Sequence, residues 1–496
     1  MLPQMLHESD TPPVLAGRCN SAVRRARAGA SVIFGRLGLW LVVAAAGQAV
    51  PGAAAAPEPL VLPMPSGAPQ SIDFARDPLV LFDRAAGPSQ PFLELVGHAV
   101  EVHPAVGVAI ASAQASAAVR VQVRAGLFPQ IDAALVGDRA LARDFGDRTA
   151  IVESLRVRGR TDAVVTGEQL IYDFGATGNR IAAANERILA ARAEVERVAD
   201  ETALQAVAAW YNVLAYQTLV DLAGAMAARQ RDILGDVRSR LAQGLGAGGD
   251  VARAEAVLAD SEAAAARYER LLAQARARYR EAFGTDAPPR LSRSLPPASA
   301  AQSLDAATML AEKSPVVVAA RRRAEAARRD WRAAKADGLP RLTAGINGSR
   351  YDVFTGSDYE VRGNFALRQS LFAGGRQRGV IAEAGAQARG AGFNADQIAA
   401  ATERDAAAAF TDVAALSRST AALGTAYAAN RRVRDGYVEQ FRVSRGSLIE
   451  LLRAEEDYFN AAAAYLQGVV ELDIARYTLL ARTGEMLPVI GIKLVI

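Results

Sequence analysis

Few residues of this chain are of the types that carry out catalysis or hold metal ions. It has three histidines (His7, His98 and His103) and one cysteine, Cys19. His98 and His103 are five positions apart, a spacing that does not place both on one helix face, so surface positions are expected. A single cysteine excludes a disulfide framework and a thiol-based metal site. We therefore predict no catalytic site, no cofactor and no metal.

A glycine-rich stretch over residues 243–249 (QGLGAGG) could suggest a loop that binds phosphate. Such a loop follows a strand and ends in Lys-Ser or Lys-Thr, whereas this stretch follows a helical pattern and has neither. The stretch is more typical of a turn between two helices. Energy for any transport would therefore have to come from a partner protein.

The charge of the chain does not favour binding to nucleic acid. Its formal net charge is +4, and almost all of the basic residues are arginines mixed with acidic residues. No platform of interleaved aromatic residues accompanies them. An arginine-rich, solvated surface is the simpler interpretation.

The glycine-rich turn is followed by a sequence pattern that occurs twice in the chain. Residues 250–255 (DVARAE) and 450–455 (ELLRAE) are 200 positions apart, as are Trp210 and Phe410. Upstream, the offset is 211, which relates Pro104 to Pro315 and Pro129 to Pro340. This repetition predicts a tandem duplication in which each copy is one structural unit.

Each copy ends in a pair of long helices that fold back on each other, and the turns are predicted at 243–249 and 444–447. A helix of about 64 residues over 178–241 would be about 95 Å long. The return helices carry apolar residues at seven-residue spacing, which is typical of coiled-coil packing. One seam comprises Val251, Leu258, Ala265, Leu272 and Tyr279; two others comprise Leu451, Tyr458, Tyr465, Leu472 and Leu479, and Leu452, Phe459, Leu466, Asp473 and Leu480.

Between the helices the period changes from helical to alternating, which predicts strands. The clearest case is 359–372, where Tyr359, Val361, Phe365 and Leu367 point one way and Glu360, Arg362, Asn364 and Arg368 point the other. Its hairpin partner is 341–351, and weaker alternation predicts strands at 130–141 and 160–172. Such strands have one apolar face and one charged face.

The first residues of the chain are typical of an export leader. Arg24, Arg25 and Arg27 precede an apolar run over 37–46 and a stretch of small residues over 48–56. The run is shorter than the 20 or so residues that a membrane anchor needs. The predicted segments are a leader (1–56), a Pro-rich extension (57–91), a first repeat (92–287), a linker (288–303), a second repeat (304–485) and a tail (486–496).

Four strands with an apolar outer face cannot close a membrane barrel alone, because an open edge in lipid leaves backbone groups unpaired. Bacterial barrels start at about eight strands, so a dimer with 8 or a trimer with 12 is required. The alternatives are a small amphipathic sheet on a soluble helical protein, or a coiled-coil stalk without a lumen. The predicted fold class is α+β, mostly α.

Three stretches show a resemblance to a known family. Residues 446–460 (GSLIELLRAEEDYFN), 475–484 (ARYTLLARTG) and 369–375 (QSLFAGG) resemble the TolC family of outer-membrane export ducts, and the likeness covers about 92–485. It is strongest to members that serve type I secretion, including those that export RTX-type toxins such as adenylate cyclase–haemolysin. The resemblance implies a homotrimer with a 12-stranded barrel in outer-membrane lipid and a periplasmic α-helical barrel. It also implies a periplasmic adaptor and an inner-membrane ABC transporter as partners.

The resemblance also implies roles for residues near the two turns. The turns would be periplasmic tips that contact the adaptor, and their residues are Gly244, Leu245, Gly246, Gly248, Gly249, Ser444 and Ser447. Glu450 matches an acidic residue that narrows the entrance in relatives, and Asp250 is its counterpart in the first repeat. Arg453 and Gly446 depart from the family pattern at the same entrance. A second interpretation of Glu450 is an acidic residue that stabilises the first turn of its helix.

Three functions agree with these observations. The first is an exit duct for a secreted protein, and the second is a duct for small-molecule efflux. The third is a periplasmic coiled-coil scaffold without a pore.

Overall fold

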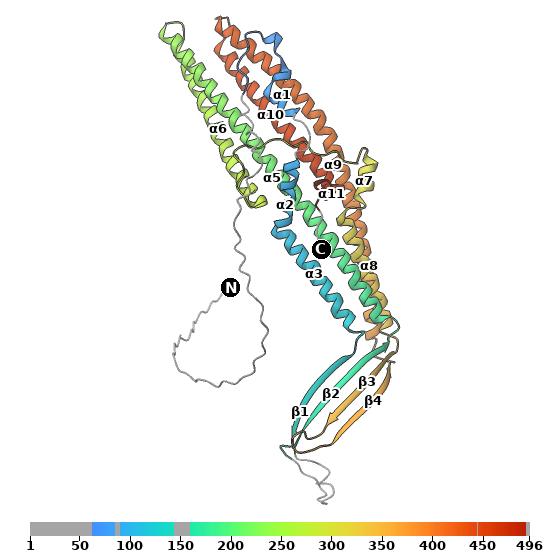
Figure 1. The fold of residues 1–496 in the computed structure, drawn as a ribbon. Helices are drawn as coiled ribbons and strands as arrows, with labels where there is room; N and C mark the ends of the chain where they lie inside the picture. Colours follow the sequence, from blue (N-terminus) through green and yellow to red (C-terminus); the bar gives the residue numbers. More distant parts are fainter. Residues whose placement is uncertain (1–61, 85–89, 143–158, 444, 493–496) are drawn as a thin grey trace, which may run out of the picture. The chain divides into compact units, whose positions relative to one another are not determined.

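The computed structural model describes residues 62–84, 90–142, 159–443 and 445–492. Within these residues the same order of elements occurs twice: two helices, two strands, a very long helix and a shorter helix that returns along it (Figure 1). The fold is mostly helical with one four-stranded antiparallel sheet, which confirms that part of the predicted fold class. The predicted leader over 1–56 lies outside the described residues.

The elements of the two repeats correspond one to one. The first repeat contains α2 (Gln90–Val102), α3 (Pro104–Ala125), β1 (Gln130–Arg139), β2 (Gly159–Tyr172), α5 (Ala176–Ala242) and α6 (Gly248–Phe283). The second contains α7 (Leu304–Ala311), α8 (Pro315–Ala336), β3 (Arg341–Arg350), β4 (Tyr359–Arg368), α9 (Arg376–Arg442) and α10 (Leu448–Arg482). The segment before them forms η1 (Pro69–Ser71), η2 (Phe74–Arg76) and α1 (Pro78–Asp83), and α11 (Met486–Ile490) follows them.

Glycines set the point where each second strand gives way to its long helix. Gly175 and Gly375, the N-cap residues of α5 and α9, have φ angles of 85° and 87°, a conformation that a side chain would strain. The strand predicted over 359–372 ends earlier than expected, at Arg368, because its partner β3 begins at Arg341, which lies opposite Arg368. Both helices have 67 residues, which corresponds to a length of about 100 Å.

The seams of the return helices are buried to different degrees in the two repeats. All ten predicted seam positions of α10 are buried, whereas α6 buries only Leu272 and Tyr279 and leaves Val251, Leu258 and Ala265 half-buried. The reason is that α10 packs against α9 and also against α5, while α6 packs mainly against α5. The two copies share a fold but not a burial pattern.

Asp473 is a polar residue within an otherwise apolar seam of α10, and an ion pair explains its position. It is fully buried and accepts two hydrogen bonds from the guanidinium of Arg293, at 2.6 and 3.0 Å. Burial raises the pKa of Asp473, while Arg293 opposes that shift. Arg293 comes from the predicted linker, 180 positions away, so the spacing within α10 could not reveal this partner.

The segment before α2 is fastened to the second hairpin by buried polar contacts. Asp77, which is 1% exposed, accepts a hydrogen bond from the Tyr427 hydroxyl at 2.9 Å and forms an ion pair with Arg431. The Tyr465 hydroxyl donates to Asp83 at 2.8 Å. Residues 62–84 thus contain short helical turns and lie against α9 and α10.

Candidate functional site

The four strands form one sheet in the order β1-β2-β3-β4, with every neighbouring pair antiparallel (Figure 1). In an antiparallel pair, residues directly opposite each other lie on the same face. The register therefore shows which side chains share a face across the whole sheet. It also leaves β1 and β4 as the two edges of the sheet within the described residues.

One face of the sheet is apolar. Val361 and Phe365 of β4 lie opposite Gly348 and Ala344 of β3, and Leu367 lies opposite Leu342. Tyr359, Val361, Phe365 and Leu367 are 79%, 63%, 82% and 69% exposed in the single chain. The same face continues through β2 and β1, where Val165 lies opposite Ala133 and Ala163 opposite Leu135. An apolar face this exposed indicates contact with lipid or with another protein.

The opposite face of the sheet is polar. Glu360, Arg362, Asn364 and Arg368 lie opposite Ser349, Asn347, Gly345 and Arg341. In the first hairpin, Asp132 lies opposite Thr166, and Glu168 lies opposite Gln130. Sequence analysis did not single out the polar residues of the first hairpin, because glycines and alanines weaken its alternation. The strand register is what shows that these residues lie on the polar face.

The first tip turn, between α5 and α6, depends on glycine geometry. Gly244 has a φ of 75°, and a Cβ atom on Gly246 would lie 3.2 Å from the backbone nitrogen of Leu241. The backbone nitrogen of Leu245 donates to the carbonyl of Arg240 at 2.9 Å, which closes the end of α5. Leu245 itself is exposed, and Gly248 and Gly249 begin α6, with Asp250 half-buried in its first turn.

The second tip turn, between α9 and α10, ends in a capping box. The Glu450 backbone nitrogen donates to the Ser447 hydroxyl at 3.2 Å, and the Ser447 nitrogen donates to the Glu450 carboxylate at 3.3 Å. This supports the stabilising role of Glu450 in its helix, while its side chain stays exposed. Gly446 is half-buried and Arg453 is exposed. Ser444, also predicted at this tip, lies outside the described residues.

The structure brings the two tip turns together. The Arg240 guanidinium donates to the Phe441 carbonyl at 2.8 Å and lies 3.9 Å from the centre of the Phe441 ring. An apolar cluster that includes Ile233, Val237 and Leu451 packs below the turns. These contacts join residues about 200 positions apart, which sequence analysis did not find.

A buried layer of charged side chains lies further along the hairpins. Glu455 of α10, only 1% exposed, forms ion pairs with Arg229 of α5 at 3.1 Å and with Arg434 of α9 at 3.6 Å. Arg434 also donates to the neighbouring Asp435 at 2.6 Å. This layer links the two hairpins of one chain through a single carboxylate.

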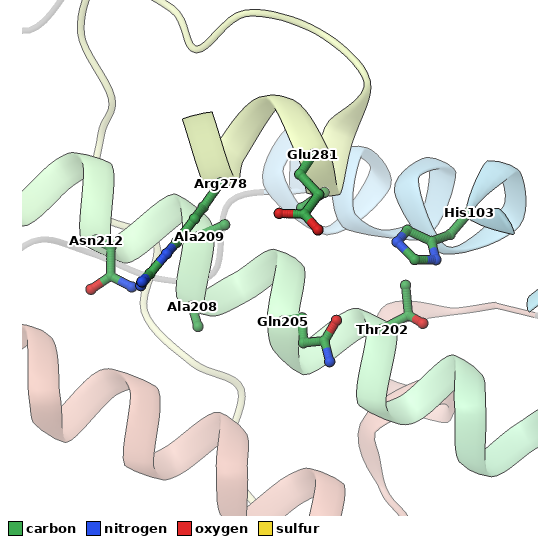
Figure 2. A pocket seen from close by; sticks show the side chains of 9 residues that line it. His103, Thr202, Gln205, Ala208, Ala209, Asn212, Arg278 and Glu281 are labelled. Carbon is green, nitrogen blue, oxygen red and sulfur yellow. The ribbon is translucent and has the colours of Figure 1, made fainter. Parts of the chain in front are cut away.

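A cavity of about 320 Å³ lies where α3 begins and α6 ends, beside α5 (Figure 2). His103 caps the start of α3, since its Nδ1 atom accepts a hydrogen bond from the Ala105 nitrogen at 3.2 Å. Arg278 and Glu281 of α6 and Gln205 of α5 also line the cavity. Among the described residues, no group of three or more His, Cys, Asp or Glu side chains could hold a metal ion.

The comparisons with known proteins agree with this architecture. Residues 95–285 match the family model described as "Outer membrane efflux protein". This part of the chain is similar to that family, whose members are TolC-type outer-membrane transport channels rather than enzymes. This confirms the predicted family, the predicted outer-membrane location and the prediction that the protein is not an enzyme.

Among curated relatives, the chain is 27% identical over 348 residues to the outer membrane efflux protein BepC of Brucella suis biovar 1 (strain 1330). The aligned region covers 66% of this chain and 75% of BepC. Among solved structures, the outer-membrane channel OprN is 21% identical, with a TM-score of 0.70 over 80% of this chain and 90% of OprN. The outer membrane protein VceC of Vibrio cholerae is 17% identical, with a TM-score of 0.71 over 80% of this chain and 99% of VceC.

Proposed function

We propose that three copies of this chain form an outer-membrane exit duct. The observation that carries this proposal is the four-stranded sheet, which has one apolar face, one polar face and two open edges. In lipid, every backbone hydrogen-bonding group must be paired, so β1 and β4 must join the strands of other copies. Three copies would supply 12 strands, enough for a water-filled lumen.

The helices support the same assembly. α3 is long and apolar enough to cross a membrane by length and composition, yet only 11% of its apolar window is buried within the chain. Val108 and Val121 on this helix are 71% and 68% exposed. α9 also leaves most of its surface uncovered. Contact between α3 of one copy and α9 of the next would cover both and continue the barrel as a helical cylinder in the periplasm.

The two sheet faces then have separate roles. Tyr359, Val361, Phe365 and Leu367 would contact outer-membrane lipid, and Glu360, Arg362, Asn364 and Arg368 would line the lumen. The paired tip turns would form the periplasmic entrance and contact the adaptor. Three copies of Asp250 and Glu450 at that entrance would favour cations by their charge, with Gly446 and Arg453 beside them.

We propose a secreted protein as the cargo, delivered by an inner-membrane ABC transporter through a periplasmic adaptor as in type I secretion. The resemblance of residues 446–460 and 475–484 to type I members supports this, and an RTX-type toxin such as adenylate cyclase–haemolysin is the class of substrate that it suggests. Small-molecule efflux is the second candidate, because the family description and the name of BepC both refer to efflux.

Two experiments test the proposal. Purified protein in planar bilayers should conduct as a stable channel with the native mass of a trimer; a monomer, or a trimer without conductance, would instead support the scaffold without a pore. Deletion of the gene should abolish secretion of the protein exported by the partner ABC transporter and leave drug sensitivity unchanged. Intact secretion with increased drug sensitivity would support the efflux role.

A further inference from the structure

The structure contains two cavities at equivalent places in the two repeats. The first is the one in Figure 2, and the second lies where α8 begins and α10 ends, beside α5 and α9. Thr202 and Gln205 line the first cavity, and Thr402 and Asp405, 200 positions later, line the second, to which Gln205 also contributes. His103 and Ser314, the residues that precede Pro104 and Pro315, take the same place in each. The cavities are therefore a product of the duplicated fold.

Of these two cavities, and among the described residues, only the second has buried polar atoms without hydrogen-bond partners. Asp200 is 7% exposed and Ser314 is 2% exposed. Within the described part of the chain, the Asp200 Oδ1 atom and the Ser314 hydroxyl have no hydrogen-bond partner. Ser314 is the N-cap residue of α8, yet its side chain makes no capping bond. In the first cavity the comparably buried Thr202 donates to the Val198 carbonyl at 2.8 Å.

No cation in the part of the chain that the structure describes neutralises Asp200. On α5, Glu196 repels its negative charge, and the Arg197 guanidinium is already hydrogen-bonded to Glu194 and Glu201, each at 2.9 Å. Burial raises the pKa of Asp200 to about 7, and the backbone N–H of Leu487 in α11 opposes the shift only in part.

Among the described residues, the other elements around the cavity bring no cation that lowers the pKa of Asp200. On α9, Asp405 is paired with Arg404 at 2.8 Å. Arg482 at the end of α10 is exposed, and α8 contributes the uncharged Ser314 and Val316. An unpaired buried carboxylate is stabilised either by a proton or by a cation that enters from outside.

We propose that this second cavity binds an organic ammonium ion that has an apolar body. The ammonium would pair with the Asp200 carboxylate, and the apolar body would lie against Leu204, Val316 and Ile398. The reverse orientation is disfavoured because the N-terminus of α8, at Ser314, repels cations. The Ser314 hydroxyl would donate a hydrogen bond to an acceptor atom at the far end of the ligand. The cavity volume of about 510 Å³ is within the range of sites for small molecules.

The test compares 4-phenylbutylamine with 4-phenylbutanoate, which have similar apolar bodies and opposite charges. Isothermal titration calorimetry with the full-length purified protein at pH 8 should show the amine binding at least tenfold more tightly than the carboxylate. At pH 6 the affinity for the amine should fall about tenfold, because a proton then competes for Asp200. No binding of the amine, or equal affinity for both probes, would overturn the proposal.

Variants show whether Asp200 is responsible. Asp200→Asn should lose at least tenfold in affinity for the amine and lose its pH dependence, while it keeps the melting temperature of a folded protein. Ser314→Ala should lose affinity for amines that carry an acceptor at the far end and keep it for 4-phenylbutylamine. Glu281→Gln in the first cavity is the matched control and should bind as the native protein does. Native affinity in Asp200→Asn would refute the site.

Discussion

The proposed lipid-facing side of the sheet leads to a quantitative prediction at Phe365. β4 has 10 residues, so at about 3.4 Å per residue and a tilt of about 45° it would span about 24 Å, close to the apolar band of an outer-membrane barrel. Phe365 lies about 5 Å along the strand from its centre, which places it near the bilayer midplane. Phe365→Arg should therefore cost about 2–4 kcal/mol per chain and about 6–12 kcal/mol per trimer.

The matched control is Asn364→Arg, one position away on the opposite face of the same strand. It should insert normally, because an arginine there would extend into the lumen, and it should shift the ion selectivity of the channel toward anions. The assay measures the fraction of each variant that is recovered from outer-membrane fractions as a trimer, followed by reversal potentials in planar bilayers. Normal assembly of Phe365→Arg, or equal failure of both variants, would show that the faces are assigned wrongly.

Three further predictions concern the helices. The pKa of Asp200 is about 7 in the folded chain and near 3.8 in the unfolded chain, so the folded chain binds one more proton between these pH values. Relative to Asp200→Asn, the free energy of unfolding should therefore fall by about 1.4 kcal/mol for each pH unit from 3.8 to 7. A difference in melting temperature that stays constant from pH 4 to 7 would contradict this. Glu455→Gln should destabilise the chain by about 1–3 kcal/mol in urea titrations, because Arg229 loses its carboxylate partner and Arg434 keeps only Asp435. The repeat-related Glu255→Gln, whose partner Arg238 is exposed, should cost less than about 1 kcal/mol, and equal effects would be inconsistent with the buried layer. Replacement of all residues over 244–249 by alanine should extend α5 through the turn and abolish export, while the strands still insert into the membrane. Normal secretion by this variant would argue against the role of this turn as a periplasmic tip.

Local patterns in the sequence were enough to predict the long helices and the four strands, but not the short helices at 69–83 and 486–490. The seven-residue spacing in α10 predicted a helix buried along two seams, and alternation over 359–368 predicted β4. Both signals come from residues close together in the chain, whose side chains repeat with the period of their own backbone. The glycine-rich stretch was also correctly interpreted as a turn between helices, since its glycines close the end of α5.

The residues that connect distant parts of the chain could not be predicted in this way. Asp473 looked like an exception in an apolar seam, until the structure placed Arg293 against it. Arg240 and Phe441 join the two tips, and Asp77 binds Tyr427 from 350 positions away. No periodicity marks such partners, because each depends on how separate helices pack. The unpaired Asp200 was missed for the same reason, since its environment comes from five different helices.

The two return helices are buried to different degrees, so α10 forms part of the core while α6 keeps an exposed surface. α10 is covered by α9, α5 and the N-terminal segment, and its buried Glu455 and Asp473 are held by arginines from elsewhere in the chain. The corresponding helix α6 has Glu255 in an exposed ion pair and a half-buried seam. Its charged residues can therefore be replaced at little cost in stability, whereas those of α10 cannot. Of the two return helices, α6 is accordingly the one with surface still free to contact a neighbouring copy or another protein.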